Sequence, residues 1–225
     1  MNILFATSEC APFIKTGGLA DVAGALPKAL AGNGHDVRVI LPLYEGIGEE
    51  WRSQMTYLQC FHITLAWRSP YCGIFELKRD GVTYWFVDNE YYFKRSNIYG
   101  HYDDGERFAY FSRAVVESMG WLNWHPDVLH CNDWQTGLIP VFLEHFYRSK
   151  ERYQKIRTVF SIHNIRFQGR WKIPEVKDVT SLPNTVFTPE GIESYGESNY
   201  LKGGIVYADA VTTVSKSYAM EIMTP

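Results

Sequence analysis

Lys15-Thr16-Gly17-Gly18-Leu19-Ala20-Asp21-Val22 links two stretches with very different patterns. Residues 2–7 before it are apolar, as in a buried strand, and apolar residues recur at helical spacing over about 21–31 after it. Asp21 is placed to cap this helix, which continues across Pro27. A strand, a glycine loop and a helix in this order predict the first unit of an α/β fold.

The paired glycines suit this loop to ligand binding. Without Cβ atoms, Gly17 and Gly18 allow a ligand to approach the backbone closely and present bare N–H groups. The positive end of the helix dipole and the cation of Lys15 lie beside them. The loop therefore predicts a site for a phosphate or a densely hydroxylated ligand, and the simpler alternative is that the glycines only turn the chain.

The rest of the chain continues the alternation of strands and helices. Further strands are predicted at 36–41, 127–131, 156–162 and 210–214, and further helices at about 105–119, 135–147, 199–207 and 216–223. Residues 55–88 instead alternate like antiparallel strands, with a hairpin turn at Asp80-Gly81, and 89–104 and 163–197 are predicted loops. The pattern indicates one α/β domain with a Rossmann-like, mostly parallel sheet, helices on both faces and an antiparallel hairpin insertion.

Composition argues against several classes of function. The 225 residues carry a formal net charge of −3, which gives no electrostatic case for binding nucleic acid or an anionic membrane. No apolar run is long enough to span a bilayer and no secretory signal precedes the first strand, so the expected location is cytoplasmic. The cysteines lack metal-binding spacing, and Asp103-Asp104 is expected to lie in a solvated loop. We expect no metal and no cofactor.

Four polar segments directly follow predicted strands. They are Lys15-Thr16-Gly17-Gly18 after 2–7, Asn132-Asp133-Trp134 after 127–131, His163-Asn164 after 156–162, and Ser215-Lys216 after 210–214. The carboxyl ends of parallel strands meet at one edge of a sheet, and α/β proteins bind their ligands beyond that edge. The sequence therefore predicts that these segments share a single cleft.

The same segments resemble a known family. Residues 8–22 are similar to the amino-terminal signature of bacterial glycogen synthases and plant starch synthases. Further blocks resemble that family in the same order, at 132–137, 161–169, 200–205 and 208–215. The resemblance implies the amino-terminal half of a GT-B fold. It also implies a retaining glycosyltransferase that moves glucose from ADP-glucose to the non-reducing end of an α-1,4-glucan.

The resemblance further implies roles for individual residues. His163 and Asp133 are the expected catalytic residues, with the main-chain carbonyl of His163 facing the anomeric centre. The expected substrate-binding residues are Lys15, Thr16, Gly17, Gly18, Asp21, Tyr99, Asn164, Gln168, Gly203 and Gly204. Among these, Lys15 would help to hold the diphosphate, Asn164 would orient the glucose, and Tyr99 belongs to a loop that would cover the cleft.

Some of these positions have simpler explanations. A histidine at the end of a strand can satisfy nearby backbone groups, and Asp133 can cap the helix that begins near Trp134. The family has histidines on both sides of this Asp-Trp pair, whereas this chain has Asn132 and Gln135. These departures put a ligand-binding role for both flanking positions in doubt.

The resemblance extends to residue 225, where the family continues into a second domain. We therefore expect residues 1–225 to be the amino-terminal, acceptor-side domain, without the carboxy-terminal nucleotide-binding domain and inactive alone. ADP-glucose would bind mainly through the missing domain, and the glucan acceptor through this one. A non-catalytic glucan-binding module is the alternative. A dinucleotide-binding protein is disfavoured because the first loop lacks G-x-G-x-x-G.

Overall fold

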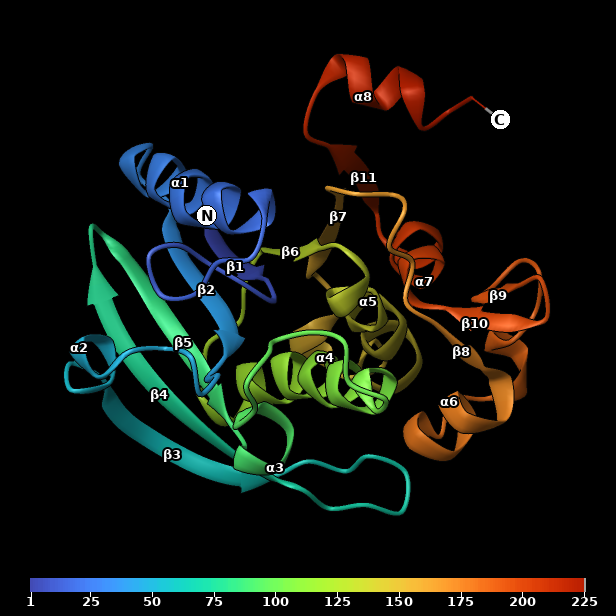
Figure 1. Ribbon diagram of the computed structural model, residues 1–225, viewed down its shortest axis with the longest axis horizontal. Helices are drawn as coiled ribbons and strands as arrows, with labels where there is room; N and C mark the ends of the chain where they lie inside the picture. Colours follow the sequence, from blue (N-terminus) through green and yellow to red (C-terminus); the bar gives the residue numbers. More distant parts are fainter. Residues whose placement is uncertain (225) are drawn as a thin grey trace.

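Strand β1 (Asn2–Ala6) lies inside an eight-stranded sheet with the order β11-β7-β6-β1-β2-β5-β4-β3 (Figure 1). The structure is a computed structural model that describes residues 1–224. The other strands are β2 (Asp36–Pro42), β3 (Thr56–His62), β4 (Tyr71–Arg79), β5 (Val82–Asp88), β6 (Val128–Asn132), β7 (Arg157–Ile162) and β11 (Ala210–Thr213). Neighbours from β11 to β5 pair in parallel, and β5, β4 and β3 pair antiparallel. The predicted mostly parallel sheet is confirmed.

The predicted hairpin is also present. Asp80 and Gly81 adopt φ values of 52° and 77°, the left-handed pair that a tight turn between twisted antiparallel strands requires. The strands that it joins do not form a separate insertion beside the sheet. Because β5 pairs in parallel with β2, the hairpin extends one edge of the main sheet.

Helices cover both faces of the sheet. Helix α1 (Gly18–Gly32) packs on β2 and β5, whereas α4 (Asp104–Trp121), α5 (Leu138–Phe142) and α7 (Tyr200–Tyr207) pack against one another. The crossover from β1 to β2 moves along the sheet in one direction, and the crossovers from β5 to β6, β7 and β11 move in the other. Right-handed crossovers in opposite directions place their helices on opposite faces, as Figure 1 shows for α1 and α4.

The segment 163–197, predicted as a loop, contains further structure. It holds β8 (Arg170–Lys172), α6 (Ile173–Thr180), a 3₁₀ turn (Asn184–Val186), β9 (Glu193–Ser194) and part of β10 (Glu197–Asn199). The three strands form a small antiparallel sheet in the order β8-β10-β9. The prediction was wrong because elements this short show no detectable periodicity.

The remaining helical segments are short. They are α2 (Glu49–Arg52), α3 (Glu90–Phe93), a 3₁₀ turn (Trp134–Thr136), a π turn (Leu143–Tyr147), a 3₁₀ turn (Glu151–Tyr153) and α8 (Lys216–Glu221). The helix predicted at 135–147 is thus divided into a 3₁₀ turn, α5 and a π turn. The loop predicted at 89–104 contains α3. Within residues 1–224 no helix has the length and apolar character needed to cross a membrane, and no cluster of His, Cys, Asp and Glu could hold a metal ion.

Helix α1 begins earlier than predicted. Gly17 is its N-cap, and the helix continues through the buried Pro27. Asp21 therefore lies in the first turn, where it pairs with Lys15 at 2.6 Å. The prediction that Asp21 caps the helix is wrong, because the extended backbone of Gly17 permits an earlier start than side-chain capping rules indicate.

Candidate active site

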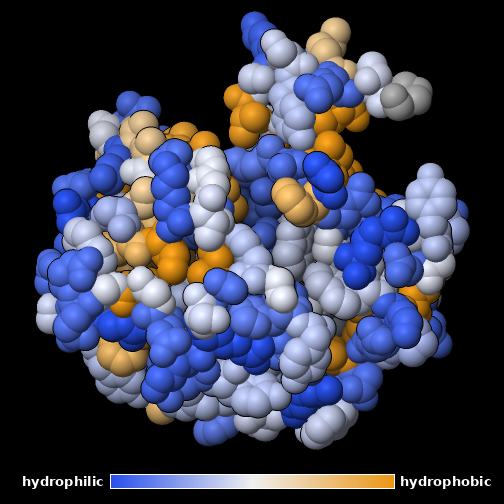
Figure 2. All heavy atoms as spheres, in the orientation of Figure 1, coloured by the Kyte–Doolittle hydropathy of each residue, from blue (hydrophilic) through white to orange (hydrophobic). Residues whose placement is uncertain are grey.

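A cleft of about 880 Å³ opens at the carboxyl ends of β1, β6 and β7. It is lined by seven of the predicted site residues, namely Thr16, Gly17, Gly18, Tyr99, Asp133, His163 and Asn164. Figure 2 shows the surface hollowed between the parts of the molecule formed by α1 and α8. The predicted convergence of the segments that follow β1, β6 and β7 is confirmed. The last strand contributes Val214 to the cleft, in place of the predicted Ser215 and Lys216.

A second hollow of about 950 Å³ lies near the amino ends of β6 and β7. Its lining combines Trp121, Tyr147 and Tyr153 with surface charges of both signs, including the exposed Lys150 and Arg152. Ligands of open α/β sheets bind at the opposite end of the strands. The cleft at the carboxyl ends is therefore the candidate active site.

The glycine loop is held by a buried carboxylate, Glu9. Its Oε2 accepts hydrogen bonds from the Thr16 N–H at 2.5 Å, the Thr16 hydroxyl at 2.8 Å and the Gly17 N–H at 3.2 Å. One of the two amides predicted to be bare, that of Gly17, is thus occupied. The amides of Gly18 and Leu19 donate to no group within residues 1–224, so this end of α1 keeps free N–H groups. Glu9 lines the cleft and was not among the predicted residues.

Lys15 is not among the residues that line the cleft within the described part of the chain. Its Nζ contacts both carboxylate oxygens of Asp21, at 2.6 and 2.8 Å, and both side chains are more than half exposed. Such an exposed ion pair contributes little to stability because water screens it. The two residues therefore lie close together at the start of α1, where the pair can rearrange at little cost.

Asp133 connects the ends of β6 and β7. Its backbone has a φ of 56°, and its Oδ1 accepts the N–H groups of His163 at 2.7 Å and Asn164 at 3.3 Å. It makes no side-chain cap to the following 3₁₀ turn, so the capping alternative is excluded. Burial raises the pKa of this carboxyl to about 6, against the lowering effect of the two N–H groups.

His163 is an uncharged histidine near neutral pH. Burial lowers its pKa to about 4, because the imidazolium ion is poorly solvated in the cleft wall. Its Nε2 lies 2.9 Å from Oδ1 of Asn132. Asn132 is one of the positions whose role was in doubt, and here its side chain contacts the predicted catalytic histidine. Gln135 is 6% exposed and lines the same cleft.

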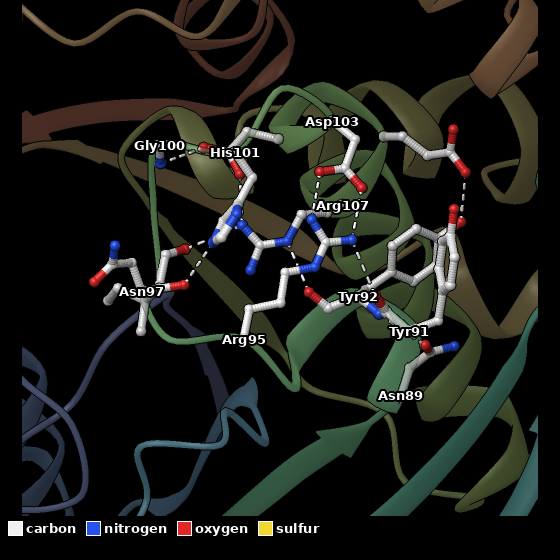
Figure 3. Close-up of polar contacts among 12 residues, drawn as sticks. Asn89, Tyr91, Tyr92, Arg95, Asn97, Gly100, His101, Asp103 and Arg107 are labelled. Carbon is white, nitrogen blue, oxygen red and sulfur yellow. Dashed lines mark hydrogen bonds and ion pairs between the residues drawn. The ribbon is translucent and has the colours of Figure 1, made fainter.

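Tyr99 reaches the cleft from the segment between α3 and α4. Its hydroxyl lies 2.6 Å from the hydroxyl of Ser8, which follows β1. The segment is held by an ion pair and a hydrogen bond, as Figure 3 shows: Arg95 binds both carboxylate oxygens of Asp103, and the guanidinium of Arg107 donates to the main-chain carbonyl of Tyr92. These contacts fix the loop that carries Tyr99.

Asp103 and Asp104 were predicted to lie in a solvated loop, and that prediction is wrong because both side chains are largely buried in ion pairs. Asp104 pairs with Arg107, whose side chain is fully buried, and also accepts the N–H of Gly100 at 2.8 Å. Asp104 and Arg107 lie three residues apart in the first turn of α4. Arg95 belongs to the loop and Asp103 is the N-cap of α4, so the proximity of these two residues depends on how the loop folds back, which their spacing does not reveal.

Comparisons with known proteins agree with this geometry. A family model described as the starch synthase catalytic domain matches residues 2–225. The chain belongs to this family. The predicted resemblance and the fold class, one α/β half of a GT-B fold, are both confirmed.

Individual relatives of this starch synthase family chain cover its whole length. Glycogen synthase from Lachnospira eligens is 52% identical over 225 residues, which are 100% of this chain and 47% of the relative. Glycogen synthase from Geobacillus stearothermophilus is 52% identical over 224 residues, which are 100% of this chain and 46% of that relative. The chain thus spans about half the length of the curated relatives that it matches. These relatives do not favour the alternative of a non-catalytic glucan-binding module.

A solved structure of the family superposes closely. It is the catalytic domain of starch synthase IV from Arabidopsis thaliana bound to ADP and acarbose, with a TM-score of 0.90 and 31% identity. The match covers 99% of this chain and 46% of that chain.

Within this family chain, Gln168 lies beside the cleft. Its amide accepts from Asn199 at 2.8 Å and donates to the carbonyl of Ile165 at 3.3 Å. It lines an adjoining hollow of about 470 Å³ that shares Trp134 and Phe167 with the cleft. Gln168 therefore contributes to a neighbouring part of the same surface.

Gly203 and Gly204 were predicted to bind substrate, but the structure places them away from the cleft. Both are buried in α7 and neither lines the cleft of the described residues. A Cβ on Gly204 would lie 2.2 Å from the ring of Phe160, and one on Gly203 would lie 3.1 Å from Val141. Their absence of side chains allows α7 to pack closely on β7 and α5, which explains these glycines without a ligand.

Replacement of Glu9 by alanine is expected to destabilise the protein by about 1–3 kcal/mol, because three partly buried hydrogen bonds from Thr16 and Gly17 lose a charged acceptor. Urea denaturation of the wild type and the variant measures the loss. Glu9→Gln is the matched control, since it keeps a neutral acceptor and should lose less than half as much. Equal stability of Glu9→Ala and wild type would show that the loop does not depend on this carboxylate.

Proposed function

We propose that residues 1–225 form the amino-terminal, acceptor-side domain of a retaining glycosyltransferase. The complete enzyme transfers glucose from ADP-glucose to the non-reducing end of an α-1,4-glucan. The domain that binds most of the nucleotide lies outside these residues. The proposal is supported by the likeness to the Arabidopsis relative, whose structure is described as bound to ADP and acarbose.

The observation that carries the proposal is the chemistry of the cleft. Neutral His163, the amide of Asn164 and the carboxylate of Asp133 lie on one wall. These groups can donate hydrogen bonds to hydroxyl groups or accept hydrogen bonds from them, so the ligand does not have to be charged. Trp134 and Phe167 add aromatic surface to the same cleft, and Phe167 is 60% exposed. The combination suits a neutral, hydroxyl-rich ring.

The charges on the described wall support different positions for the two parts of the donor. Glu9 and Asp133 are both in the cleft, and the buried cation Arg107 is already paired with Asp104. A diphosphate beside these carboxylates would be repelled. The sugar therefore lies against this wall. The diphosphate is then proposed to meet Lys15, when it is released from Asp21, and cations of the second domain.

This division requires both domains for catalysis. Glucosyl transfer needs stabilisation of the departing diphosphate and exclusion of water that would hydrolyse the donor. Within residues 1–224, the cleft offers neither a sufficient set of cations nor an opposite wall. Residues 1–225 alone are expected to bind maltooligosaccharides and to transfer little or no glucose.

The test uses the full-length protein and ADP-[¹⁴C]glucose with a maltooligosaccharide acceptor. The expected product is a labelled glucan, and complete release of its label by an enzyme specific for α-1,4 linkages would establish retention. Residues 1–225 alone form the comparison and should incorporate almost no label. Absence of transfer by the full-length protein would contradict the proposed reaction. Robust turnover by residues 1–225 would contradict the requirement for a second domain.

A further inference from the structure

The side-chain amide of Asn132 is fixed at both ends. It is fully buried at the end of β6, and its Nδ2 donates to the main-chain carbonyl of Ala6 on β1 at 2.9 Å. A carbonyl oxygen can only accept a hydrogen bond, so the NH₂ group must face Ala6. The other end of the amide, Oδ1, then necessarily faces Nε2 of His163, which is 2.9 Å away.

This arrangement determines where the proton of His163 resides. An amide oxygen has no hydrogen to donate, so Nε2 of His163 must carry the proton that joins the two side chains. Burial keeps the ring neutral near neutral pH by lowering its pKa to about 4. A neutral imidazole has one proton, and Nδ1 is therefore an unprotonated acceptor. Within residues 1–224 no group donates to Nδ1.

We propose that Asn132 is a positioning residue that holds His163 as its Nε2–H tautomer, leaving Nδ1 to accept a hydrogen bond from a sugar hydroxyl in the cleft. The ligand part of this inference rests on the proposed function, whereas the tautomer rests on the contacts of Asn132 alone. A diphosphate oxygen has no proton to give to Nδ1 once it is ionised. The fixed tautomer thus favours the sugar over the diphosphate at this point of the wall.

Asn132 differs from the family motif, and this difference limits how His163 can be protonated. The family motif has histidine where this chain has Asn132. A neutral histidine at that position could either donate to His163 or accept from it, depending on its own tautomer. Asn132, with its NH₂ group held by Ala6, can only accept. In this chain the tautomer of His163 is therefore set by the two hydrogen bonds of Asn132.

Nitrogen NMR of the full-length protein, labelled with [¹⁵N]histidine, tests the tautomer directly. The ring signals of His163 are identified by their disappearance in His163→Gln. In the wild type near neutral pH, Nε2 should show the shift of a protonated nitrogen and Nδ1 that of an unprotonated one. An Nδ1-protonated ring in the wild type would overturn the proposal without reference to any variant.

Two variants test whether Asn132 is the cause. Asn132→Leu removes the acceptor and should produce a mixture of tautomers at His163. Asn132→Asp keeps an acceptor at this position, so Nε2 of His163 should stay protonated, and the carboxylate should favour protonation of Nδ1 as well, which removes the Nδ1 acceptor. An unchanged Nε2–H tautomer in folded Asn132→Leu, or loss of the Nε2 proton in Asn132→Asp, would overturn the role of Asn132. If Asn132→Leu does not fold, Asn132→Ala, which removes the same acceptor with a smaller side chain, takes its place.

Ser161→Ala is the matched control. It removes the contact between the Ser161 hydroxyl and Nε2 of the neighbouring His130, at 2.7 Å, and leaves the contacts of His163 intact. The ring signals of His130 should change, and those of His163 should not.

Loss of the hydroxyl contact in Asn132→Asp is expected to lower kcat/KM by about 3- to 10-fold. If the full-length protein transfers no glucose, the NMR result still stands, so failure of the proposed function is distinguishable from failure of this inference.

Discussion

Asp133→Asn is expected to be more stable than the wild type near neutral pH and much less active. The carboxyl of Asp133 has a pKa of about 6 in the folded protein and near 3.8 when unfolded. Between these values the folded state holds a proton that the unfolded state has released, so stability falls as the pH rises through this window. Above the window the ionised group costs up to about 3 kcal/mol. The uncharged side-chain amide of the variant avoids this cost.

The predicted loss of activity has a different origin. Asp133 lines the cleft, while its Oδ1 holds the amides of His163 and Asn164. An asparagine can retain the Oδ1 contacts and tolerates the left-handed φ of 56°. It loses only the charge-assisted bond to a sugar hydroxyl that we propose for the carboxylate. This loss should lower kcat/KM by about 10- to 100-fold.

Denaturant unfolding from pH 3 to pH 8, in roughly unit steps around the two pKa values, compares the two proteins. His130 and His163 have pKa values lowered to about 4. Their contribution to the stability of the protein is therefore lost as the pH falls, whereas the contribution of Asp133 is lost as the pH rises. Both histidines are present in both proteins, and the difference between the curves therefore isolates Asp133. Asp133→Ala separates geometry from charge, because it also removes the acceptor for two amides and should be destabilised. Parallel curves for wild type and Asp133→Asn would contradict the raised pKa.

Gly137→Ala is expected to cause the largest loss of stability. A Cβ at this position would lie 2.0 Å from the carbonyl oxygen and 2.6 Å from the carbonyl carbon of Tyr200. These are backbone atoms at the start of α7, which also carries the amides of Tyr200 and Leu201 that bind Gly169 and Gln168. The helix would have to move as a unit. We expect a loss of about 3 kcal/mol or more and a Tm lower by about 6–12 °C.

Gly32→Ala is the control for this substitution. Gly32 lies at the end of α1, and a Cβ there would meet nothing within 4 Å. Alanine favours the helix over glycine, so this variant should be as stable as the wild type or slightly more stable. Thermal unfolding followed by circular dichroism measures both variants. A Tm of Gly137→Ala equal to that of Gly32→Ala would show that α7 does not pack against the backbone of Gly137.

The parts of the molecule that could be predicted from sequence are those governed by repeating patterns. Buried parallel strands such as β1 are largely continuous apolar runs, and the rule for the carboxyl ends of parallel strands then locates Asp133 and His163 together. The turn at Asp80-Gly81 follows from two residues that accept positive φ. In each case the local sequence alone carries the information.

The parts that could not be predicted depend on contacts between distant residues. Glu9 occupies the amides of the glycine loop through a fold-back of the intervening segment, and Asn132 reaches Ala6 and His163 across neighbouring strands. A polar residue after a strand was the available signal for Glu9. For Gly203 and Gly204, motif similarity suggested ligand contact, whereas close packing of α7 explains them. Composition cannot distinguish these two uses of glycine.

The carboxylate under the glycine loop has a consequence for the thermodynamics of binding. Because Thr16 and Gly17 are anchored before any ligand arrives, their backbone has already lost its conformational freedom during folding. Association of a sugar then does not have to order this loop, and the entropic penalty falls on the ligand and on whatever closes over it. The wall therefore acts as a rigid template, and a calorimetric signature of loop ordering should be absent when a maltooligosaccharide binds.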